Sequence, residues 1–153
     1  MRAFIINTDA SFSMKWHKGA WAYWIKGDNG LVLKNAGMIP AEIPNPGLAE
    51  LLAFSKALGE INKLIPKQKR WETKLYINTD CTYVIHVIDG TMKQSKYMTL
   101  IKAIRHALVG YQVRPQHVKA HTGHRSGRSR MNHWCDKEAK KIMKEEGYLD
   151  ERQ

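Results

Sequence analysis

A chain of 153 residues with 43% hydrophobic content has the size and apolar share of one ordinary globular domain. No apolar run approaches the roughly 20 residues of a membrane-spanning helix, and Asn7 interrupts the apolar start too early for a secretory signal peptide, so we expect a soluble, cytoplasmic protein. The formal net charge of +11 favours an anionic partner, and nucleic acid is the commonest one.

The N-terminal part of the chain predicts an antiparallel meander. A short apolar run from Arg2 ends at Asp9, which indicates a buried strand. The Asn29-Gly30 pair is a strong signal for a hairpin between two further strands. The three strands are expected at residues 2–8, 19–26 and 31–38, and a proline- and glycine-rich loop follows at 41–47.

The second part of the chain alternates helices with strands. Apolar residues recur at helical spacing from Leu48 to Ile65, and Pro66 stops the pattern. The elements expected after it are a strand at 71–79, helices at 82–89 and 96–109, a strand at 113–119 and an amphipathic helix at 132–146. Because strands linked through helices pair in parallel, we predict an α/β domain with a mixed five-stranded sheet, three strands antiparallel and then two parallel, flanked by helices.

Four acids occupy places from which they can meet at one rim of this sheet. The sequence Ile-Asn-Thr-Asp ends both the first strand, at Asp9, and the fourth, at Asp80. If these strands are parallel neighbours, both acids lie where open α/β sheets place their sites. Glu50 is expected in the first turn of the first long helix and Asp136 in the first turn or two of the last. Singly, each acid is also explained by a turn or by the helix dipole, so only their joint placement indicates function.

Carboxylates gathered within a few ångströms repel one another unless protons or cations intervene. Hard oxygen ligands suit Mg²⁺ or Mn²⁺. Two such ions roughly 4 Å apart can clamp the attacking and leaving oxygens of an in-line phosphoryl displacement. The acids together with the basic charge therefore predict a metal-dependent nuclease.

Four motifs, in this order along the chain, resemble those of type 1 ribonuclease H. They are Thr8-Asp9-Ala10-Ser11, Ala49-Glu50-Leu51-Leu52, Asn78-Thr79-Asp80 with Tyr83-Val84, and Val118-Lys119-Ala120-His121-Thr122-Gly123-His124 leading to Asn132-His133-Trp134-Cys135-Asp136. The correspondence runs from Ile5 to about Lys141. It implies a ribonuclease H-like catalytic domain, expected over residues 1–146, with a short C-terminal tail over 147–153.

The resemblance also implies an activity and the residues that carry it. The activity is endonucleolytic hydrolysis of the RNA strand of an RNA/DNA hybrid, which leaves 5′-phosphate and 3′-hydroxyl ends. Two Mg²⁺ or Mn²⁺ ions would be held by Asp9, Glu50, Asp80 and Asp136. His121 matches a loop histidine of the family that assists proton transfer or product release, a task that suits an ordinary pKa of about 6.5.

Further residues are expected to contact substrate. Asn132 matches an asparagine before the family's last helix, where a capping role is an equal alternative. Arg125 and Arg128, in a loop that looks long for the family, can pair with phosphate or remain solvated. Trp16, flanked by basic residues, can stack on a base or sugar. The full set is Ser11, Trp16, Asn45, Thr82, Arg125, Arg128 and Asn132.

Several departures from the family pattern bear on substrate choice. Ala10 stands where glycine is usual, only a shifted Asn45 can replace an asparagine pair, and Thr82 stands where glutamine is common. Because these positions help to sense the ribose 2′-hydroxyl, DNA or double-stranded RNA remains an alternative substrate, and a non-catalytic hybrid-binding module remains an alternative function. The basic protrusion of many bacterial members is also missing, with only residues 91–96 in its place. We expect a monomer.

Overall fold

A five-stranded sheet forms the middle layer of the computed structural model, which describes residues 2–92, 96–117 and 127–149, with the side chains of 127–129 excepted. The strands are β1 (Arg2–Ser13), β2 (Lys18–Gly27), β3 (Val32–Met38), β4 (Thr73–Thr79) and β5 (Gln112–His117). The helices are α1 (Pro46–Leu64), α2 (Thr82–Asp89), α3 (Met98–Leu108) and α4 (Gly127–Glu145), with a short 3-10 helix, η1 (Lys67–Glu72), before β4. Among the described residues, no helix is long and apolar enough to cross a membrane.

The strand order is β3-β2-β1-β4-β5, and the pairing confirms the predicted mixed sheet. β1 pairs with β2, and β2 with β3, in the antiparallel sense. β4 pairs with β1 and with β5 in the parallel sense. β1 is therefore the central strand, with an antiparallel neighbour on one side and a parallel neighbour on the other.

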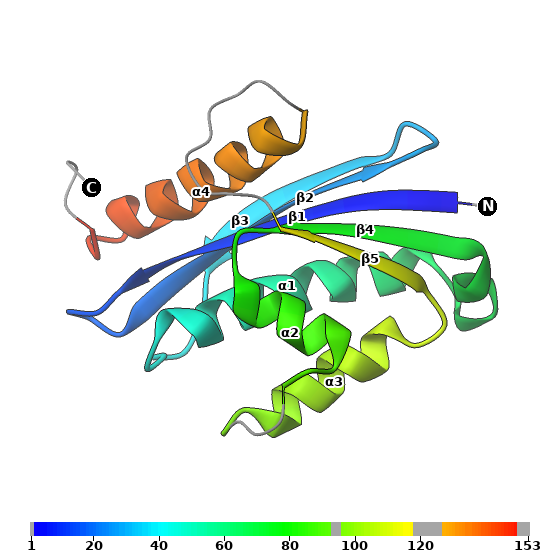
Figure 1. Ribbon diagram of the computed structural model, residues 1–153. Helices are drawn as coiled ribbons and strands as arrows, with labels where there is room; N and C mark the ends of the chain where they lie inside the picture. Colours follow the sequence, from blue (N-terminus) through cyan, green and yellow to red (C-terminus); the bar gives the residue numbers. More distant parts are fainter. Residues whose placement is uncertain (1, 93–95, 118–126, 150–153) are drawn as a thin grey trace.

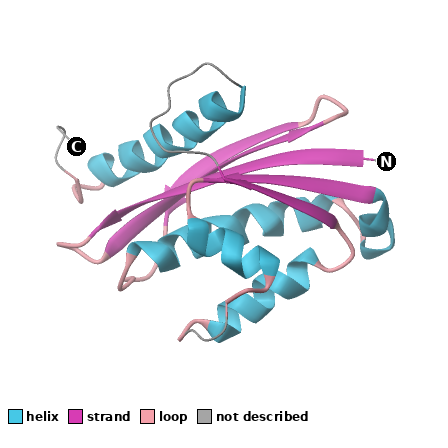
Figure 2. Ribbon diagram, viewed as in Figure 1, coloured by secondary structure: helices cyan, strands magenta, loops and turns pink. Residues whose placement is uncertain are grey.

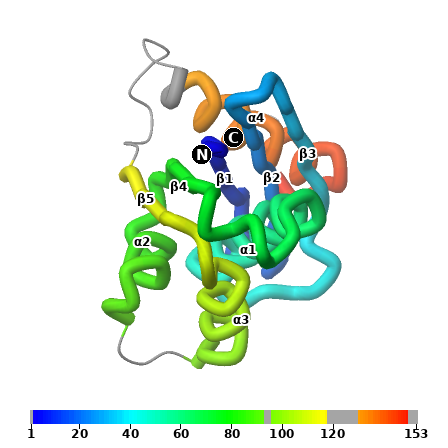
Figure 3. Tube along the Cα trace, turned by 90° about the vertical axis from the view of Figure 1, so that its right-hand side faces the viewer, coloured from blue at the N-terminus to red at the C-terminus, as the bar shows by residue number. Residues whose placement is uncertain are grey.

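The helices cover the two faces of the sheet unequally. Figure 1 and Figure 2 show α4 on one face and α1, α2 and α3 on the other. Figure 3, turned by 90°, shows the same division on either side of the row of strands. The larger core lies between the sheet and α1–α3, and its biggest buried side chains include Phe4, Ile6, Phe54, Leu58, Ile61, Leu75 and Ile77.

Small residues form most of the fully buried contact between α4 and the sheet. Ala20 and Ala22 of β2 face Cys135, Ala139 and Met143 of α4, and all five are fully buried. Short side chains on both surfaces let the helix axis lie close to the strands. This close approach holds the middle of α4 beside β1, where the candidate site lies.

The start of α1 is fixed by its cap. The side chain of Asn45 accepts a hydrogen bond from the backbone N–H of Leu48 at 2.9 Å, and Pro46 occupies the first helical turn. An asparagine cap followed by proline is a favourable way to begin a helix. The helix therefore starts two residues before the Leu48 start expected from the apolar stripe.

Three other predicted boundaries were wrong by two to five residues. β1 continues to Ser13 because β2 pairs with it as far as Ser13↔Lys18, although its later residues are polar. Trp71 and Glu72 belong to η1, so β4 begins only at Thr73. The last helix begins at Gly127 rather than at residue 132. The prediction missed its first turns because they lack the apolar spacing that marks the remainder of the helix. The expected end of β5 at 119 falls on residues outside the described part. The division of the chain at residue 146 stays a prediction.

Candidate metal centre

Three acids from separate elements come together beside the central strand. Asp9 lies within β1, Glu50 within α1, and Asp80 directly after β4. One carboxylate oxygen of each lies within 4.8 Å of those of the other two. The parallel register that pairs Asn7 with Asn78 explains why Asp9 and Asp80, two residues further on, are neighbours.

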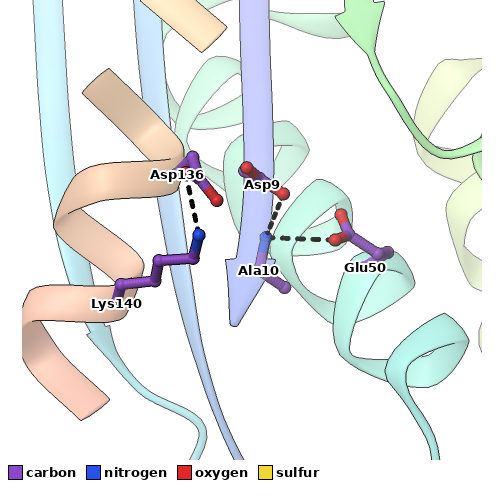
Figure 4. A network of polar contacts seen from close by, with 5 residues as sticks. All are labelled: Asp9, Ala10, Glu50, Asp136 and Lys140. Carbon is purple, nitrogen blue, oxygen red and sulfur yellow. Dashed lines mark hydrogen bonds and ion pairs between the residues drawn. The ribbon is translucent and has the colours of Figure 1, made fainter. Parts of the chain in front are cut away.

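The fourth acid approaches from the opposite side. Figure 4 shows Asp136 on α4 at one side of Asp9, and Glu50 on α1 at the other side. Asp136 forms an ion pair with Lys140, one helical turn further along, at 3.3 Å. Asp136 lies well inside α4 because the helix starts early, so its expected place in the first turns was wrong. Glu50 likewise lies one turn deeper in α1 than predicted, since the first turn of α1 contains no acid.

The backbone of Ala10 contributes a donor to the cluster. Its N–H lies 2.9 Å from Oδ1 of Asp9 and 3.3 Å from Oε1 of Glu50. One N–H shared between two carboxylates offsets only part of their repulsion. Oε2 of Glu50 is buried and has no hydrogen-bond partner among the described residues. The site thus has an excess of oxygen acceptors over donors.

The protonation of the acids reflects this excess. Burial, followed by the negative charge of Asp80, raises the pKa of Asp9 from 3.8 to about 8. Burial, and then the charge of Asp9, raises the pKa of Glu50 well above its ordinary value of 4.5. Without a cation, the cluster therefore retains protons near neutral pH. Hard carboxylate oxygens without enough donors fit a divalent cation such as Mg²⁺ or Mn²⁺.

Buried polar contacts between β1 and α4 lie next to the acids. The side-chain amide of Asn7 donates to Sδ of Met131 at 3.4 Å, and Sγ of Cys135 donates to the backbone oxygen of Asn7 at 3.5 Å. These contacts join α4 to β1 close to Asp9 and Asp136. These contacts were not predicted, although the repeated Ile-Asn-Thr-Asp unit marks Asn7 and its neighbour Asn78.

The residues expected to contact substrate are dispersed around the cluster. Ser11 is buried in β1, and Thr82 is exposed at the start of α2, two residues after Asp80. Asn45 uses its oxygen to cap α1 and donates its amide to the hydroxyl of Tyr97 at 2.6 Å. Asn132 is buried inside α4, so the alternative that it caps this helix was wrong.

His121 and Arg125 lie outside the described residues. Arg128 belongs to the first turn of α4, but its side chain also lies outside the described part. Trp16 is exposed in the turn between β1 and β2, away from the acids.

Lysines on α4 form a basic surface that the sequence analysis missed. Lys137, Lys140, Lys141 and Lys144 line one hollow together with Asp136. Their spacing of three or four residues puts them on one side of a helix. The spacing of these lysines is visible in the sequence. It does not distinguish a phosphate-binding surface from solvated lysines on an amphipathic helix until the helix is placed beside the acids.

Comparisons with known proteins give a consistent result. A family profile described as RNase H matches residues 1–144. An N-terminal RNase H domain from Mycobacterium tuberculosis, solved as a fusion with maltose-binding protein, is 13% identical with a TM-score of 0.73, over 95% of this chain and 96% of that one. RNase H1 from the archaeon Halobacterium salinarum is 14% identical with a TM-score of 0.72, over 94% and 98%. LC11-RNase H1 from compost is 17% identical with a TM-score of 0.68, over 94% and 99%. No curated protein sequence matches this chain.

Proposed function

Because this chain belongs to the ribonuclease H family, as the match over residues 1–144 shows, we propose that it hydrolyses the RNA strand of RNA/DNA hybrids with two divalent cations, leaving 5′-phosphate and 3′-hydroxyl ends. The observation that carries the proposal is the convergence of Asp9, Glu50 and Asp80 within 4.8 Å. Asp136 lies on α4, on the other side of Asp9 from Glu50, and completes the proposed ligand set. A surface that only binds nucleic acid would not need carboxylates placed so close that they repel one another.

In this proposal each acid has a positional role. Asp9 on β1, Glu50 on α1 and Asp80 after β4 would hold the cations together. Asp136 would add a ligand from α4, on the other side of Asp9 from Glu50. When bound, Mg²⁺ or Mn²⁺ would supply activation of the attacking water and charge neutralisation at the leaving 3′ oxygen. The N–H of Ala10 fixes the carboxylate orientation, because it faces both Asp9 and Glu50. Lys140 restrains Asp136 through their ion pair.

Proton transfer and substrate positioning are assigned to residues around this centre. His121 exchanges a proton with the reacting groups or assists product release, as in the family pattern. Ser11, Thr82 and Asn132 contact the substrate strand near the acids. Arg125 and Arg128 pair with phosphate groups. The protein works as a cytoplasmic monomer.

A second substrate class is favoured by the contacts of Asn45. Its amide oxygen caps α1 and its amide nitrogen donates to Tyr97, so both groups are already engaged. A residue held in this way is a poor sensor of the ribose 2′-hydroxyl. Double-stranded RNA or DNA is therefore the second candidate substrate.

A side-by-side cleavage assay tests the proposal. Labelled RNA/DNA hybrid, double-stranded RNA, single-stranded RNA and duplex DNA are incubated with the protein in Mg²⁺, in Mn²⁺ and in EDTA. We expect metal-dependent cleavage that is fastest on the RNA strand of the hybrid. Equal cleavage of double-stranded RNA would support the second candidate, and binding of hybrid without turnover in either metal would contradict an enzymatic function.

The basic surface of α4 is expected to bind backbone phosphates. Changing Lys141 and Lys144 to glutamine together should weaken hybrid binding and reduce the slope of log affinity against log salt by about two, since each phosphate contact contributes about 0.9. Affinity measured by fluorescence anisotropy over a salt series gives this slope. The matched control is Lys67→Gln, in η1 at the other end of the molecule, which should leave the slope unchanged. An unchanged slope in the double variant would remove α4 from the binding surface.

A further inference from the structure

A pocket that the proposed reaction does not use lies beyond the end of the hairpin formed by β1 and β2. It is lined by residues 12–16 of β1 and its turn and by residues 147–149, which follow α4. Figure 1 shows these two segments, one blue and one red, at the same end of the molecule. The pocket therefore joins two parts of the chain that are far apart in sequence.

Two aromatic rings and two ammonium groups meet there. Trp16 is 48% exposed, and its ring centroid lies 6.3 Å from that of Tyr148 with the planes 58° apart, so the rings do not stack on each other. Nζ of Lys15 lies 5.1 Å from the centroid of Trp16, and Nζ of Lys18 lies 6.0 Å from that of Tyr148. Each ring is thus paired with a cation.

The turn that carries Trp16 is held by hydrogen bonds. The N–H of Trp16 donates to Oγ of Ser13 at 3.3 Å, and the N–H of His17 donates to the backbone oxygen of Ser13 at 2.8 Å. The backbone oxygen of His17 accepts from Ile43 at 2.8 Å, and His17 takes a positive φ of 52°. A large exposed aromatic on a fixed turn loses little conformational entropy when a ligand stacks on it.

We propose that this pocket binds an unpaired base of the nucleic-acid strand that runs on from the cleavage site. The base stacks on Trp16, and the flanking phosphates pair with Lys15 and Lys18. Stacking on aromatics combined with lysines along a backbone is the general mode by which proteins hold single strands. A purely apolar ligand would gain nothing from the two ammonium groups, whereas an anionic strand gains from both.

The pocket lies within reach of the metal centre. Asp9 and Lys15 are six residues apart, four of them in β1 and two in the turn that follows, so at most roughly 20 Å separates them. At about 3.4 Å per nucleotide of a stacked strand, that distance is about six base steps. The inference rests on the proposed action on nucleic acid and adds that the enzyme distinguishes a substrate with a single-stranded extension from a blunt one.

The test compares a blunt RNA/DNA hybrid with hybrids of the same paired length that carry a tail of about eight nucleotides, longer than the reach given above. The tail is placed in turn on the 5′ and the 3′ end of each strand, so that ribose and deoxyribose tails are separated. Dissociation constants are measured by anisotropy with the Asp80→Asn variant in Mg²⁺, and cleavage rates with the wild-type chain. At least one tail should tighten binding about fivefold or more, as one stacked base does.

Two variants decide the origin of that gain. Trp16→Ala should bring the ratio of blunt to tailed dissociation constants close to one, and Trp16→Phe should retain part of it. Trp71→Ala is the matched control, because Trp71 is also exposed, at 66%, but lies in η1 beside the start of β4. Melting temperatures show whether each variant is folded.

The outcomes separate this inference from the proposed function. If the hybrid is cleaved but no tail improves binding, or if the gain survives in Trp16→Ala, the pocket is not a base site. If no hybrid is bound or cleaved, the proposed function fails, and titration with the free tail oligonucleotide then tests the pocket alone. Binding of that oligonucleotide lost in Trp16→Ala supports the pocket, and binding unaffected by the change overturns it.

Discussion

Replacing Asp9 by asparagine is expected to lower metal-dependent cleavage by at least about a thousandfold, or about 4 kcal/mol in the barrier, and to stabilise the metal-free protein. Asp9 stands between Glu50 and Asp136, so no other acid of the cluster can take over its place. An amide is a poorer ligand for a hard cation than a carboxylate. Initial rates on a labelled hybrid measure the first effect, and thermal melting in EDTA measures the second.

The increase in stability follows from the cost of the buried charge. Asp9 is 3% exposed, and burial and the charge of Asp80 both disfavour its ionised form. Asparagine has nearly the same shape, carries no charge and retains an oxygen that can accept from the N–H of Ala10, so the repulsion disappears while the geometry is kept. A gain in melting temperature together with a loss of activity would distinguish a functional ligand from a residue needed for folding.

The control for this change is Asp89→Asn at the end of α2. Asp89 is exposed and lies outside the acid cluster, so the variant should match the wild-type chain in both activity and melting temperature. Full activity of Asp9→Asn would refute the metal centre. Loss of activity accompanied by a lower melting temperature would instead mean that Asp9 acts mainly in folding.

The strand pairing and the meeting of Asp9 with Asp80 could be predicted because both follow from patterns that the backbone obeys locally. Apolar runs and the Asn29-Gly30 turn set the meander, and helix-linked strands must return in parallel. The repeated Ile-Asn-Thr-Asp unit then places both acids at equivalent points, as the register of Asn7 with Asn78 confirms. No side-chain detail was needed for this part of the argument.

The parts that could not be predicted depend on long-range pairing. The polar end of β1 has no strand signature of its own, and it is extended because β2 supplies its hydrogen-bond partners up to Ser13. The first turns of α4 precede the apolar stripe by which the helix was predicted. Asn132 and Asp136 therefore lie deeper in the helix than expected. The ion pair of Asp136 with Lys140 has the spacing of many solvated helix pairs, and it gains meaning only from the position of α4 beside Asp9.

The stability of the metal-free protein is expected to fall as the pH rises from about 4 to above 8, and Mg²⁺ is expected to reverse this trend. The folded chain holds a proton on Asp9 up to a pKa of about 8, whereas the unfolded chain releases it near 3.8. Because the folded pKa is raised, the contribution to stability is fully present below the unfolded pKa and is lost as the pH passes through about 8, by up to about 6 kcal/mol.

Cation binding competes with those protons, so the increase in melting temperature caused by Mg²⁺ should be larger at pH 8.5 than at pH 6. Melting curves in EDTA and in Mg²⁺ at several pH values measure both trends. Asp9→Asn should flatten the pH dependence in EDTA and remove most of the response to Mg²⁺, while Asp89→Asn should preserve both. A Mg²⁺ response that is independent of pH, or equal in the two variants, would mean that the ion binds elsewhere, because a cation held by these acids must displace the protons that their burial retains.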